Sequence, residues 1–450
     1  MGMQNIASLH RASEASIQIT RQLIYEESFC RRHRTSDQHF TRRRKLPFAH
    51  VMVMLLQKTV RSIQLHLHDF FAALKEGVPS AAASSWCEAR LKLKHTAFIE
   101  LNERAILEVA YGGQKDFALR LWKGHRLLGI DSSLIRLPNQ PALGQEFGWR
   151  ESSNQQGAWG RFPQARWSAL TDVLNGLVID TLFVPWQQGE RALALAHLRR
   201  LQPEDLALMD RGYAGYELWA SFILARRHFV CRCPRRSFGA VNRLFEQNKE
   251  GQSIVVELQP PNGAVGAIRA AGLPERIRVR LITVRLHTGE LEVLATDLLD
   301  ETLYPTGPFG QLYHHRWGIE TYYGLVKSRL DLENFTGLSA EAVRQDLYST
   351  IFLSNLESIL IQPAQARLRQ GSEQRKHPAQ VNHAVSFHAL KSQIIQLLLS
   401  AEPIHQALPK MERWLLNNPV SARPGRKVPR QKQSAWRSYH YQRNTRKSVF

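Results

Sequence analysis

The spacing of apolar residues divides the chain into a helical first part, a central part of alternating strands and helices, and a second helical part. In residues 1–120 apolar positions recur every three to four residues, most clearly over 46–74 and 80–107. This period predicts amphipathic helices. The short Gly-Val-Pro connection at 77–79 is compatible with a helix-turn-helix. We therefore predict a helical N-terminal domain.

After residue 120 the apolar period shortens to two residues, which is typical of strands. Strands that alternate with helices predict a mixed sheet flanked by helices, and so an α/β fold class. The predicted strands are 126–137, two strands within 166–186 around the turn Leu174-Asn175-Gly176, 206–209 and 228–233, and the predicted helices are 190–201 and 216–227.

Residues 236–299 are again strand-like, with runs at 253–258, 277–286 and 290–295, and indicate a β-rich insertion. Helices resume at Gly310 and after Ser339, which is placed to cap the run 340–361. The predicted domains are a helical domain at 1–120, a first core part at 121–235, the insertion at 236–302, a second core part at 303–362, and a helical, basic C-terminal region at 363–450.

The net charge of the chain indicates what kind of partner it binds. Lys and Arg number 60 against 39 Asp and Glu, a net charge of +21, which favours a polyanion and most often nucleic acid. In the N-terminal helices, Arg90, Lys92 and Lys94 follow small residues that would let DNA approach closely. From Lys410 onward there are eleven Lys or Arg against one acid, and we expect this tail to be disordered until it meets DNA.

Two classes of protein are disfavoured by the same composition. No run approaches the roughly 20 apolar residues of a membrane helix, and residues 1–16 lack the apolar core of a secretory signal. Four cysteines make no disulfide framework, and Cys231-Arg-Cys233 ends an apolar run that indicates a strand rather than a metal site. We expect a cytoplasmic protein.

Three carboxylates are placed for chemistry on a phosphodiester. Such chemistry uses carboxylates that hold two Mg²⁺ ions about 3.5–4 Å apart. Asp131 lies within the apolar strand Leu-Leu-Gly-Ile-Asp, where an unbound charge is costly. Asp210 follows the run Leu-Ala-Leu-Met, at the carboxyl end of a strand, where open α/β sheets keep their sites. Glu320 lies on the helix predicted from Gly310.

That helix aligns four polar residues, which are Tyr313, Arg316, Glu320 and Lys327. At 100° per residue they fall within an arc of about 60° along roughly 21 Å of helix. An acid between two cations on one face suits a metal ligand whose neighbours grip phosphates.

Structural explanations compete with each assignment. Arg316 and Glu320 also fit an ordinary i,i+4 ion pair, and Asp131 and Asp210 also fit turn-capping residues. Other acids offer alternatives, namely Asp172, Asp180, Asp331 and Glu333. Spacing alone leaves these alternatives open.

The motifs resemble one known family. Tyr313-x₂-Arg316-x₃-Glu320-x₆-Lys327 resembles the signature of bacterial insertion-sequence transposases of the DDE type, the insertion sequence 4 family. Gly-Ile-Asp131-Ser-Ser, Asp210-Arg-Gly-Tyr and Thr302-Leu-Tyr-Pro resemble its other motifs. The resemblance implies an RNase H-like catalytic domain, interrupted by the insertion between the second Asp and the Glu.

The same resemblance implies roles for residues. The catalytic residues would be Asp131, Asp210 and Glu320, which would hold Mg²⁺ or, in its place, Mn²⁺. The residues that bind DNA would be Tyr313, Arg316 and Lys327. One departure concerns excision through hairpin ends, which in the family uses an aromatic residue of the insertion, typically Trp. Between 236 and 300 this chain has no Trp or Tyr, only Phe238 and Phe245. The sequence therefore does not predict the excision route.

The resulting hypothesis is a transposase acting on double-stranded DNA. It would bind terminal inverted repeats through its N-terminal helices and form a homodimer that holds two ends. It would hydrolyse one strand at each end, and the freed 3′-hydroxyl would attack target DNA. The alternatives are a nuclease of the same fold that cuts without joining, and a DNA-binding regulator without catalysis.

Overall fold

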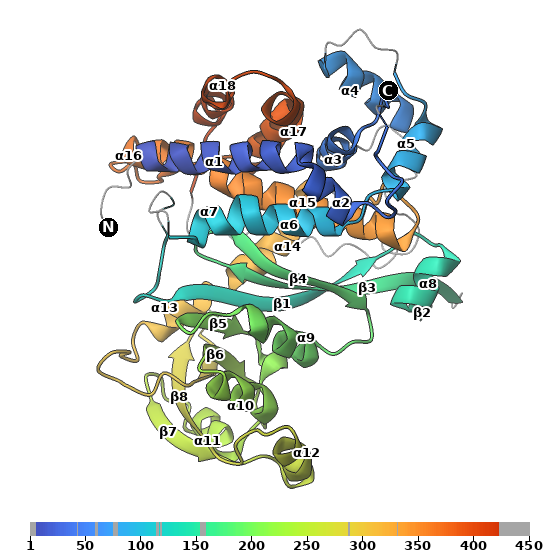
Figure 1. Cartoon of the computed structure of the whole chain (residues 1–450). Coiled ribbons are helices and arrows are strands. Elements are labelled where there is room, and N and C mark those ends of the chain that lie inside the picture. Colours follow the sequence, from blue (N-terminus) through green and yellow to red (C-terminus); the bar gives the residue numbers. More distant parts are fainter. Residues whose placement is uncertain are drawn as a thin grey trace. The chain divides into compact units, whose positions relative to one another are not determined.

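The computed structural model describes residues 6–42, 44–58, 62–74, 80–113, 117, 119–153, 159–286, 289–330 and 332–422. The chain forms two compact units (Figure 1). The helical unit combines Met1–Leu119, Arg136–Gln164 and Leu325–Phe450, and the sheet unit combines Arg120–Ile135 and Ala165–Gly324. Each unit is therefore assembled from segments that are distant in the sequence.

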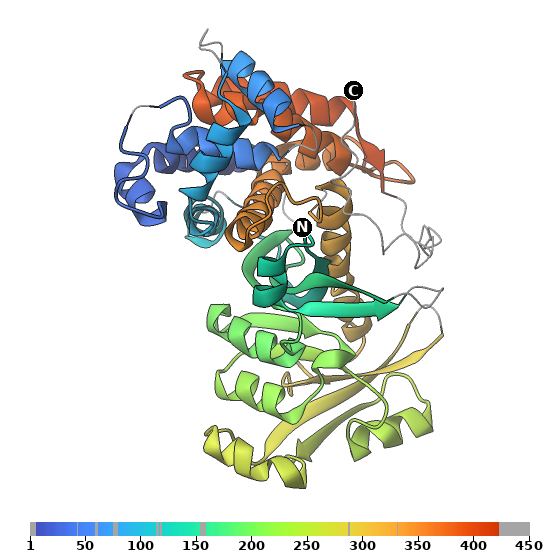
Figure 2. The ribbon, with the colours of Figure 1, turned by 90° about the vertical axis from the view of Figure 1, so that its right-hand side faces the viewer.

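In the helical unit the first helix packs against the last four, so that α1 contacts α15, α16, α17 and α18 (Figures 1 and 2). Its helices are α1 (Ile6–Tyr25), α2 (Glu27–His33), α3 (Phe48–Gln57), α4 (Ile63–Leu74), α5 (Ala83–Leu91), α6 (Thr96–Leu101), a π-helical turn (Asn102–Leu107), α7 (Glu108–Tyr111), α8 (Pro141–Phe147), α15 (Ala340–Leu360), α16 (Gln362–Gln370), α17 (His383–Leu399) and α18 (Ile404–Asn417). Short strands accompany them, namely β2 (Trp149–Ser153), β10 (Ala379–Gln380) and β11 (Val420–Ser421).

Helix α15 is buried over most of its length and on all sides, as expected for a helix at the centre of a bundle. The hydroxyl of Ser339 accepts a hydrogen bond from the Ala342 N–H at 3.2 Å, which confirms the predicted cap. The buried Asp346 carboxylate pairs with Arg90 at 2.8 Å. Arg90 is only 5% exposed, so the expectation that it faces DNA is wrong. A buried cation requires such a partner, and the partner lies far away in the sequence.

The sheet unit is built on a mixed sheet, which confirms the predicted α/β class. Its strands run in the order β4-β3-β1-β5-β6-β9-β8-β7, and β2 also pairs with β3. Strands β1, β5 and β6 are parallel, and the hairpin β3-β4 and the strands β7 to β9 are antiparallel. The strands are β1 (Arg126–Arg136), β3 (Trp159–Asp172), β4 (Leu177–Pro185), β5 (Asp205–Met209), β6 (His228–Cys233), β7 (Ser253–Leu258), β8 (Ile277–Arg285) and β9 (Leu291–Thr296).

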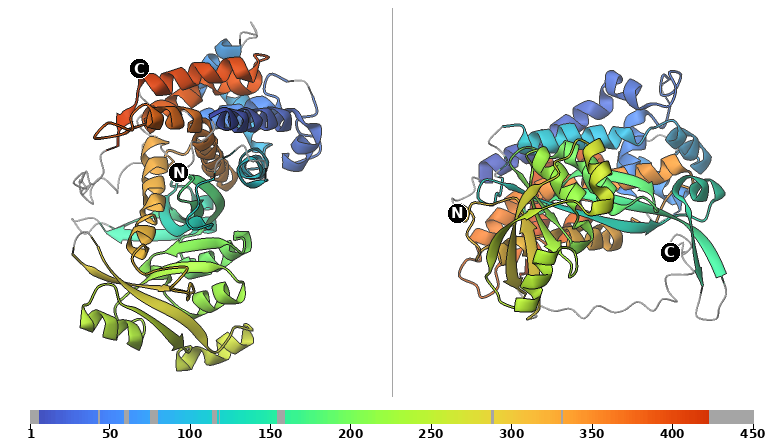
Figure 3. Two further views of the ribbon diagram at one scale, coloured as in Figure 1. Left: turned by 90° about the vertical axis from the view of Figure 1, so that its left-hand side faces the viewer. Right: turned by 90° about the horizontal axis from the view of Figure 1, so that it is seen from below.

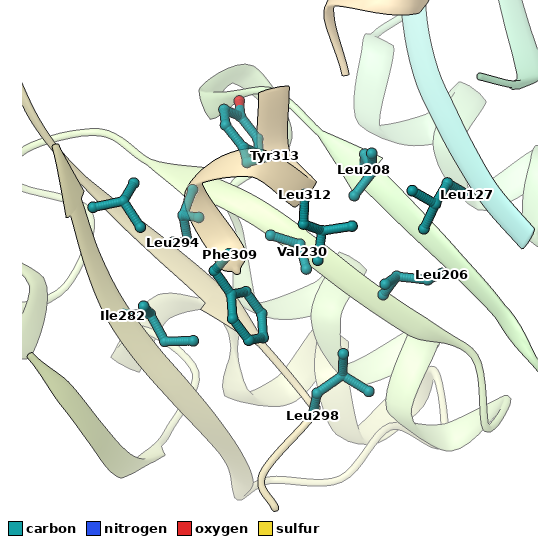
Figure 4. Packing of buried hydrophobic residues seen from close by; sticks show 11 residues of the cluster. Leu127, Leu206, Leu208, Val230, Ile282, Leu294, Leu298, Phe309, Leu312 and Tyr313 are labelled. Atoms are coloured by element: carbon teal, nitrogen blue, oxygen red, sulfur yellow. The ribbon is translucent and has the colours of Figure 1, made fainter. Parts of the chain in front are cut away.

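Helices cover both faces of this sheet. Phe229 stacks on Trp219 of α10 (Tyr216–Leu224), with ring centroids 5.6 Å apart. The next residue, Val230, points to the other face because side chains alternate along a strand. There it joins a cluster with Phe309 and Leu312 of α13 (Phe309–His314), shown in Figure 4. The sheet is therefore buried at its parallel strands, where the carboxylates lie.

The strands predicted in the central part and within 236–302 are confirmed, but two expectations for later segments are wrong. Residues 236–302 also contain helices α11 (Gly239–Gln247) and α12 (Val265–Ala270), and their strands extend the main sheet (Figure 3). The single helix from Gly310 is two helices, α13 and α14 (Trp317–Arg329). Lys410 lies within helix α18, which is ordered because Met411 and Leu415 are buried. The predicted disordered tail therefore does not begin at Lys410.

Some expectations lie outside the described residues, including the connection at 77–79, the acid Asp331 and the basic segment 423–450. Among the described residues, none of the helices has the length and hydropathy required to cross a lipid bilayer.

Candidate active site

The pairing of two parallel strands brings Asp131 and Asp210 together. In the register of β1 and β5, Ile130 lies beside Met209; Asp131 is the next residue of β1, and Asp210 directly follows the end of β5. Paired residues of adjacent parallel strands lie about 5 Å apart and face the same side of the sheet. Asp131 and Asp210, separated widely in sequence, are therefore neighbours.

Burial dominates the electrostatics of Asp131. Its carboxylate accepts the Ser132 N–H at 2.8 Å. Burial is the main cause that raises the pKa of Asp131 to about 6; Glu320 and Glu190 contribute to the rise, while the Ser132 hydrogen bond and Arg316 oppose it. The two acids and the arginine therefore lie close enough to act on this carboxylate. A cation at this position would favour the ionised form of the carboxylate.

Asp210 lies where β5 ends and accepts the N–H of Arg211 at 2.5 Å at the start of a short 3₁₀ turn, Arg211–Tyr213. Arg232 of β6 contacts the same carboxylate oxygen, with its Nε at 3.0 Å and its Nη2 at 2.9 Å. The Nη1 of Arg232 donates to Glu292 of β9 at 2.8 Å. Arg232 thus holds Asp210 from the neighbouring parallel strand.

Glu320 lies in the first turn of α14, and Arg316 donates to it across 2.7 Å. Only 3% of Arg316 is exposed, and its guanidinium lies 5.6 Å from the ring of Tyr313 and 5.0 Å from that of Trp317. Tyr313 is itself 3% exposed, and burial raises the pKa of its hydroxyl. Both residues predicted to touch DNA are therefore packed inside the protein, beside the carboxylates.

The break between α13 and α14 changes how these residues are aligned. The N–H groups of His315, Arg316, Gly318 and Ile319 each bond the carbonyl three residues earlier, at 2.9–3.2 Å. Such tight turns wind about three residues per turn, so the phase of a regular helix is lost. The four predicted residues therefore do not lie on one continuous helix, although Arg316 contacts both Tyr313 and Glu320.

Lys327 lies about two turns after Glu320 on α14, in the part of the helix that belongs to the helical unit. It is partly buried, and burial lowers the pKa of its ammonium group, which Glu333 opposes.

The rival acids have structural partners. Asp172 accepts the N–H groups of Leu174 and Asn175, at 3.1 and 3.0 Å, and so stabilises the turn between β3 and β4. Asp180 lies 2.9 Å from Nδ1 of the buried His197. Glu333 lies 3.5 Å from the Arg136 N–H. These contacts give each of the three acids a structural partner.

A second polar network borders Asp131 and was missed in the sequence. Glu190, the first residue of α9 (Glu190–His197), accepts from the Ser132 hydroxyl at 2.8 Å and from Arg166 at 2.6 Å. A charged residue inside an otherwise apolar strand, as with Arg166 and Arg232, was the available signal. The sequence does not show which acid, on another strand or helix, pairs with each of these arginines.

The two phenylalanines of segment 236–300 are engaged in packing. Phe238 lies 5.1 Å from the Trp219 ring, and Phe245 is 8% exposed beneath the Arg235 guanidinium. Trp317, by contrast, is 46% exposed and lies three residues before Glu320. The exposed aromatic ring beside the carboxylates therefore comes from α14 rather than from this segment.

Known proteins similar to this chain are transposases. It is 26% identical over 237 residues to transposase InsG for insertion sequence element IS4 of Escherichia coli, covering 52% of each chain. It is 24% identical over 185 residues to putative transposase InsZ of the same organism, covering 41% of this chain and 60% of that protein. The matches thus span only about half the length of these relatives.

Among solved structures, the chain is similar to a piggyBac transposase synaptic complex with hairpin DNA, with a TM-score of 0.42 and 11% identity over 94% of this chain and 90% of that one. Likeness at this level does not establish a common fold. The family described as Transposase DDE domain matches residues 122–356, more than half of the chain and all three acids of the cluster. The chain belongs to the Transposase DDE domain family.

Proposed function

We propose that this protein is a transposase that binds the terminal inverted repeats of an insertion sequence, cleaves a DNA strand at each end and joins the ends to target DNA. The observation that carries the proposal is the meeting of three carboxylates from separate elements. Asp131 and Asp210 are neighbours through the β1–β5 register, and Glu320 acts electrostatically on Asp131.

The topology supports a finer fold assignment. Strands β4-β3-β1-β5-β6 include a hairpin, β3-β4, and the parallel strands β1, β5 and β6; Asp131 lies on β1 and Asp210 directly follows β5. We assign this part to the RNase H-like class. Segment 236–302 would be an insertion whose strands extend the sheet, and residues 1–120 and 363–450 would supply DNA contacts around it.

The donor set fits a divalent ion. Three carboxylates supply the hard oxygen ligands that Mg²⁺ prefers, and a buried aspartate with a raised pKa is the kind of group that a cation stabilises as a carboxylate. We propose that Asp131, Asp210 and Glu320 hold Mg²⁺, for which Mn²⁺ can substitute. When bound, a pair of such ions activates the attacking oxygen and stabilises the leaving oxygen.

The chain's own residues orient these ligands. Arg316 holds Glu320, and Arg232 holds Asp210. Because Arg316 is buried and Arg232 partly buried, we assign both a positioning role, with Tyr313 packed against Arg316. Arg211 is exposed and directly follows Asp210, so we propose that it contacts a DNA phosphate, as does Lys327. Simultaneous cleavage at two ends is the reason for proposing a homodimer.

The test compares carboxylate variants on short duplexes that carry the inverted repeats flanking the gene. Asp131→Asn, Asp210→Asn and Glu320→Gln are each expected to abolish Mg²⁺-dependent nicking and joining while retaining DNA binding, because affinity arises mainly from the basic surface. Glu217→Gln, an exposed acid of α10, is the matched control. Near-wild-type nicking in any of the three variants contradicts that residue's assignment.

The same assay separates the alternatives. Nicked DNA without joined products, from wild-type protein supplied with target DNA, indicates a nuclease. Specific binding without nicking in Mg²⁺ or Mn²⁺ indicates a regulator.

A further inference from the structure

We propose that His125, Glu204 and His228 form a second metal site, which binds Zn²⁺. It is separate from the acidic cluster, which consists of Asp131, Asp210 and Glu320. One donor atom from each residue lies within 4.8 Å of the others. The three residues come from the amino ends of three adjacent parallel strands: His125 precedes β1, Glu204 precedes β5, and His228 begins β6. The pairing of Arg126 with Asp205 and of Leu206 with His228 brings these ends together.

The proposed site lies at the opposite end of the strands from the acidic cluster. His125 precedes Asp131 by six residues of extended chain, which corresponds to about 20 Å. The proposed site is therefore too far from Asp131 and Asp210 to share a metal ion with them. Metal bound here would connect three strand ends and would act on stability rather than on the reaction itself.

Hydrogen bonds at the far nitrogens prepare both imidazoles for coordination. Nδ1 of His125 lies 2.9 Å from the carbonyl oxygen of Glu204, and Nδ1 of His228 lies 2.8 Å from a carboxylate oxygen of Asp297. A carbonyl or carboxylate oxygen only accepts, so in each neutral ring Nδ1 carries the proton and Nε2 carries the lone pair. Metal-binding histidines are oriented by this same kind of bond.

Through its hydroxyl, Tyr304 is hydrogen-bonded to one of these lone pairs. Its hydroxyl lies 2.8 Å from Nε2 of His125, and its ring stacks on Trp122 with centroids 6.0 Å apart. Metal binding exchanges this hydrogen bond for coordination. Glu204 is exposed and His228 partly exposed, so the site opens to solvent on the side of the carboxylate.

The donor chemistry selects the metal. Two imidazole nitrogens and one carboxylate, with a fourth position left for water, match the ligand set of open zinc sites. Mg²⁺ prefers oxygen ligands and so belongs to the acidic cluster instead. The two sites are therefore distinguishable by metal preference.

The experiment uses full-length protein, stripped with chelator and titrated with Co²⁺ and then Zn²⁺ in excess Mg²⁺. The Glu320→Gln variant serves as background, so that the acidic cluster contributes less. We expect one tight Co²⁺ per chain with a tetrahedral absorption band, displaced by Zn²⁺, and a rise in Tm on adding Zn²⁺. The readout is metal binding, so failure of the transposase proposal does not affect it.

Four variants decide the outcome. His228→Ala and Glu204→Gln should lose the band and the Zn²⁺-dependent rise in Tm, and Glu204→Gln, at an exposed residue, protects the test against misfolding. Asp297→Asn removes the charge of the group that orients His228 and keeps an oxygen that can accept the Phe229 N–H, and it should weaken binding by about 10–100-fold. His388→Ala, an exposed histidine of α17, is the control. Unchanged Co²⁺ binding in both His228→Ala and Glu204→Gln overturns the proposal.

Discussion

The Tyr323 hydroxyl donates a hydrogen bond to the backbone carbonyl of Asp131 across 2.6 Å. The same hydroxyl accepts the Ala169 N–H at 3.1 Å, so one buried oxygen joins α14 to β1 and β3. Tyr323 follows Glu320 by three residues, which places both on one side of the helix. This contact therefore fixes the position of Glu320 relative to Asp131.

Tyr323→Phe is expected to slow cleavage while leaving DNA affinity unchanged. The change leaves the buried Ala169 N–H without its partner, which costs about 1–3 kcal/mol of unfolding free energy. A misplacement of Glu320 worth ~1.4 kcal/mol in the barrier corresponds to a tenfold slower rate. Denaturant unfolding and single-turnover nicking measure the two effects. Tyr322→Phe is the matched control, and equal nicking rates in the two variants would contradict the positioning role.

Arg232 should matter for geometry as well as for charge. It holds Asp210 and Glu292 at once, which requires the planar guanidinium. We expect Arg232→Lys to slow nicking by roughly tenfold, equivalent to ~1.4 kcal/mol in the barrier, with little change in Tm. Arg232→Ala should be slower and also less stable, because Glu292 loses its partner. Arg235→Ala, at a cation stacked on Phe245, is the control. Full activity in Arg232→Lys would show that Arg232 contributes to nicking only through its positive charge.

The carboxylates could be predicted because each obeys a local rule. Asp131 interrupts an apolar strand and Asp210 ends one, and parallel pairing of two such strands then makes them neighbours. Arg316 and Glu320 are four residues apart on the helical period, and they form the expected pair. Periodicity and strand ends thus account for most of the acidic cluster.

The remaining features depend on contacts between residues distant in sequence. Arg90 was expected at a DNA-facing surface, yet its charge is matched by Asp346 inside the helical unit. Arg232 and Glu190 were missed because their partners lie on other elements. The break after α13 shifts the helical phase through a few tight turns, which no apolar pattern records.

Lys327 should give the reaction an alkaline limit. Burial lowers the pKa of its ammonium group, so this lysine loses its charge at lower pH than an exposed one, whose pKa is ~10.4. Affinity for cleaved ends should therefore fall in the pH range below the ~10.4 of an exposed lysine. Lys327→Arg should retain affinity over that range, and Lys327→Ala should be weak throughout. Binding curves at several pH values measure this, and identical profiles for wild type and Lys327→Arg would exclude the lysine as the titrating group.

Asp180 and His197 provide a test of stability that also addresses a rival catalytic acid. The side chain of His197 is fully buried between Asp180, at 2.9 Å, and the Ser168 hydroxyl, at 3.0 Å. Burial alone would raise the pKa of Asp180, but the hydrogen bond and charge of His197 lower it below the ordinary value of 3.8. An acid with a depressed folded pKa stabilises the protein above its unfolded pKa. That stabilisation is lost as pH falls through the folded value.

Asp180→Asn should therefore lower the unfolding free energy near neutral pH by about 1–3 kcal/mol. It should also reduce the steepness with which stability falls below about pH 4, because one carboxylate no longer takes up a proton on unfolding. Nicking per folded molecule should stay near the wild-type rate, since Asp180 holds His197 rather than the reacting DNA. Thermal melts from neutral to acidic pH, together with nicking at neutral pH, measure both effects. Loss of nicking at unchanged stability would instead make Asp180 a member of the reacting site.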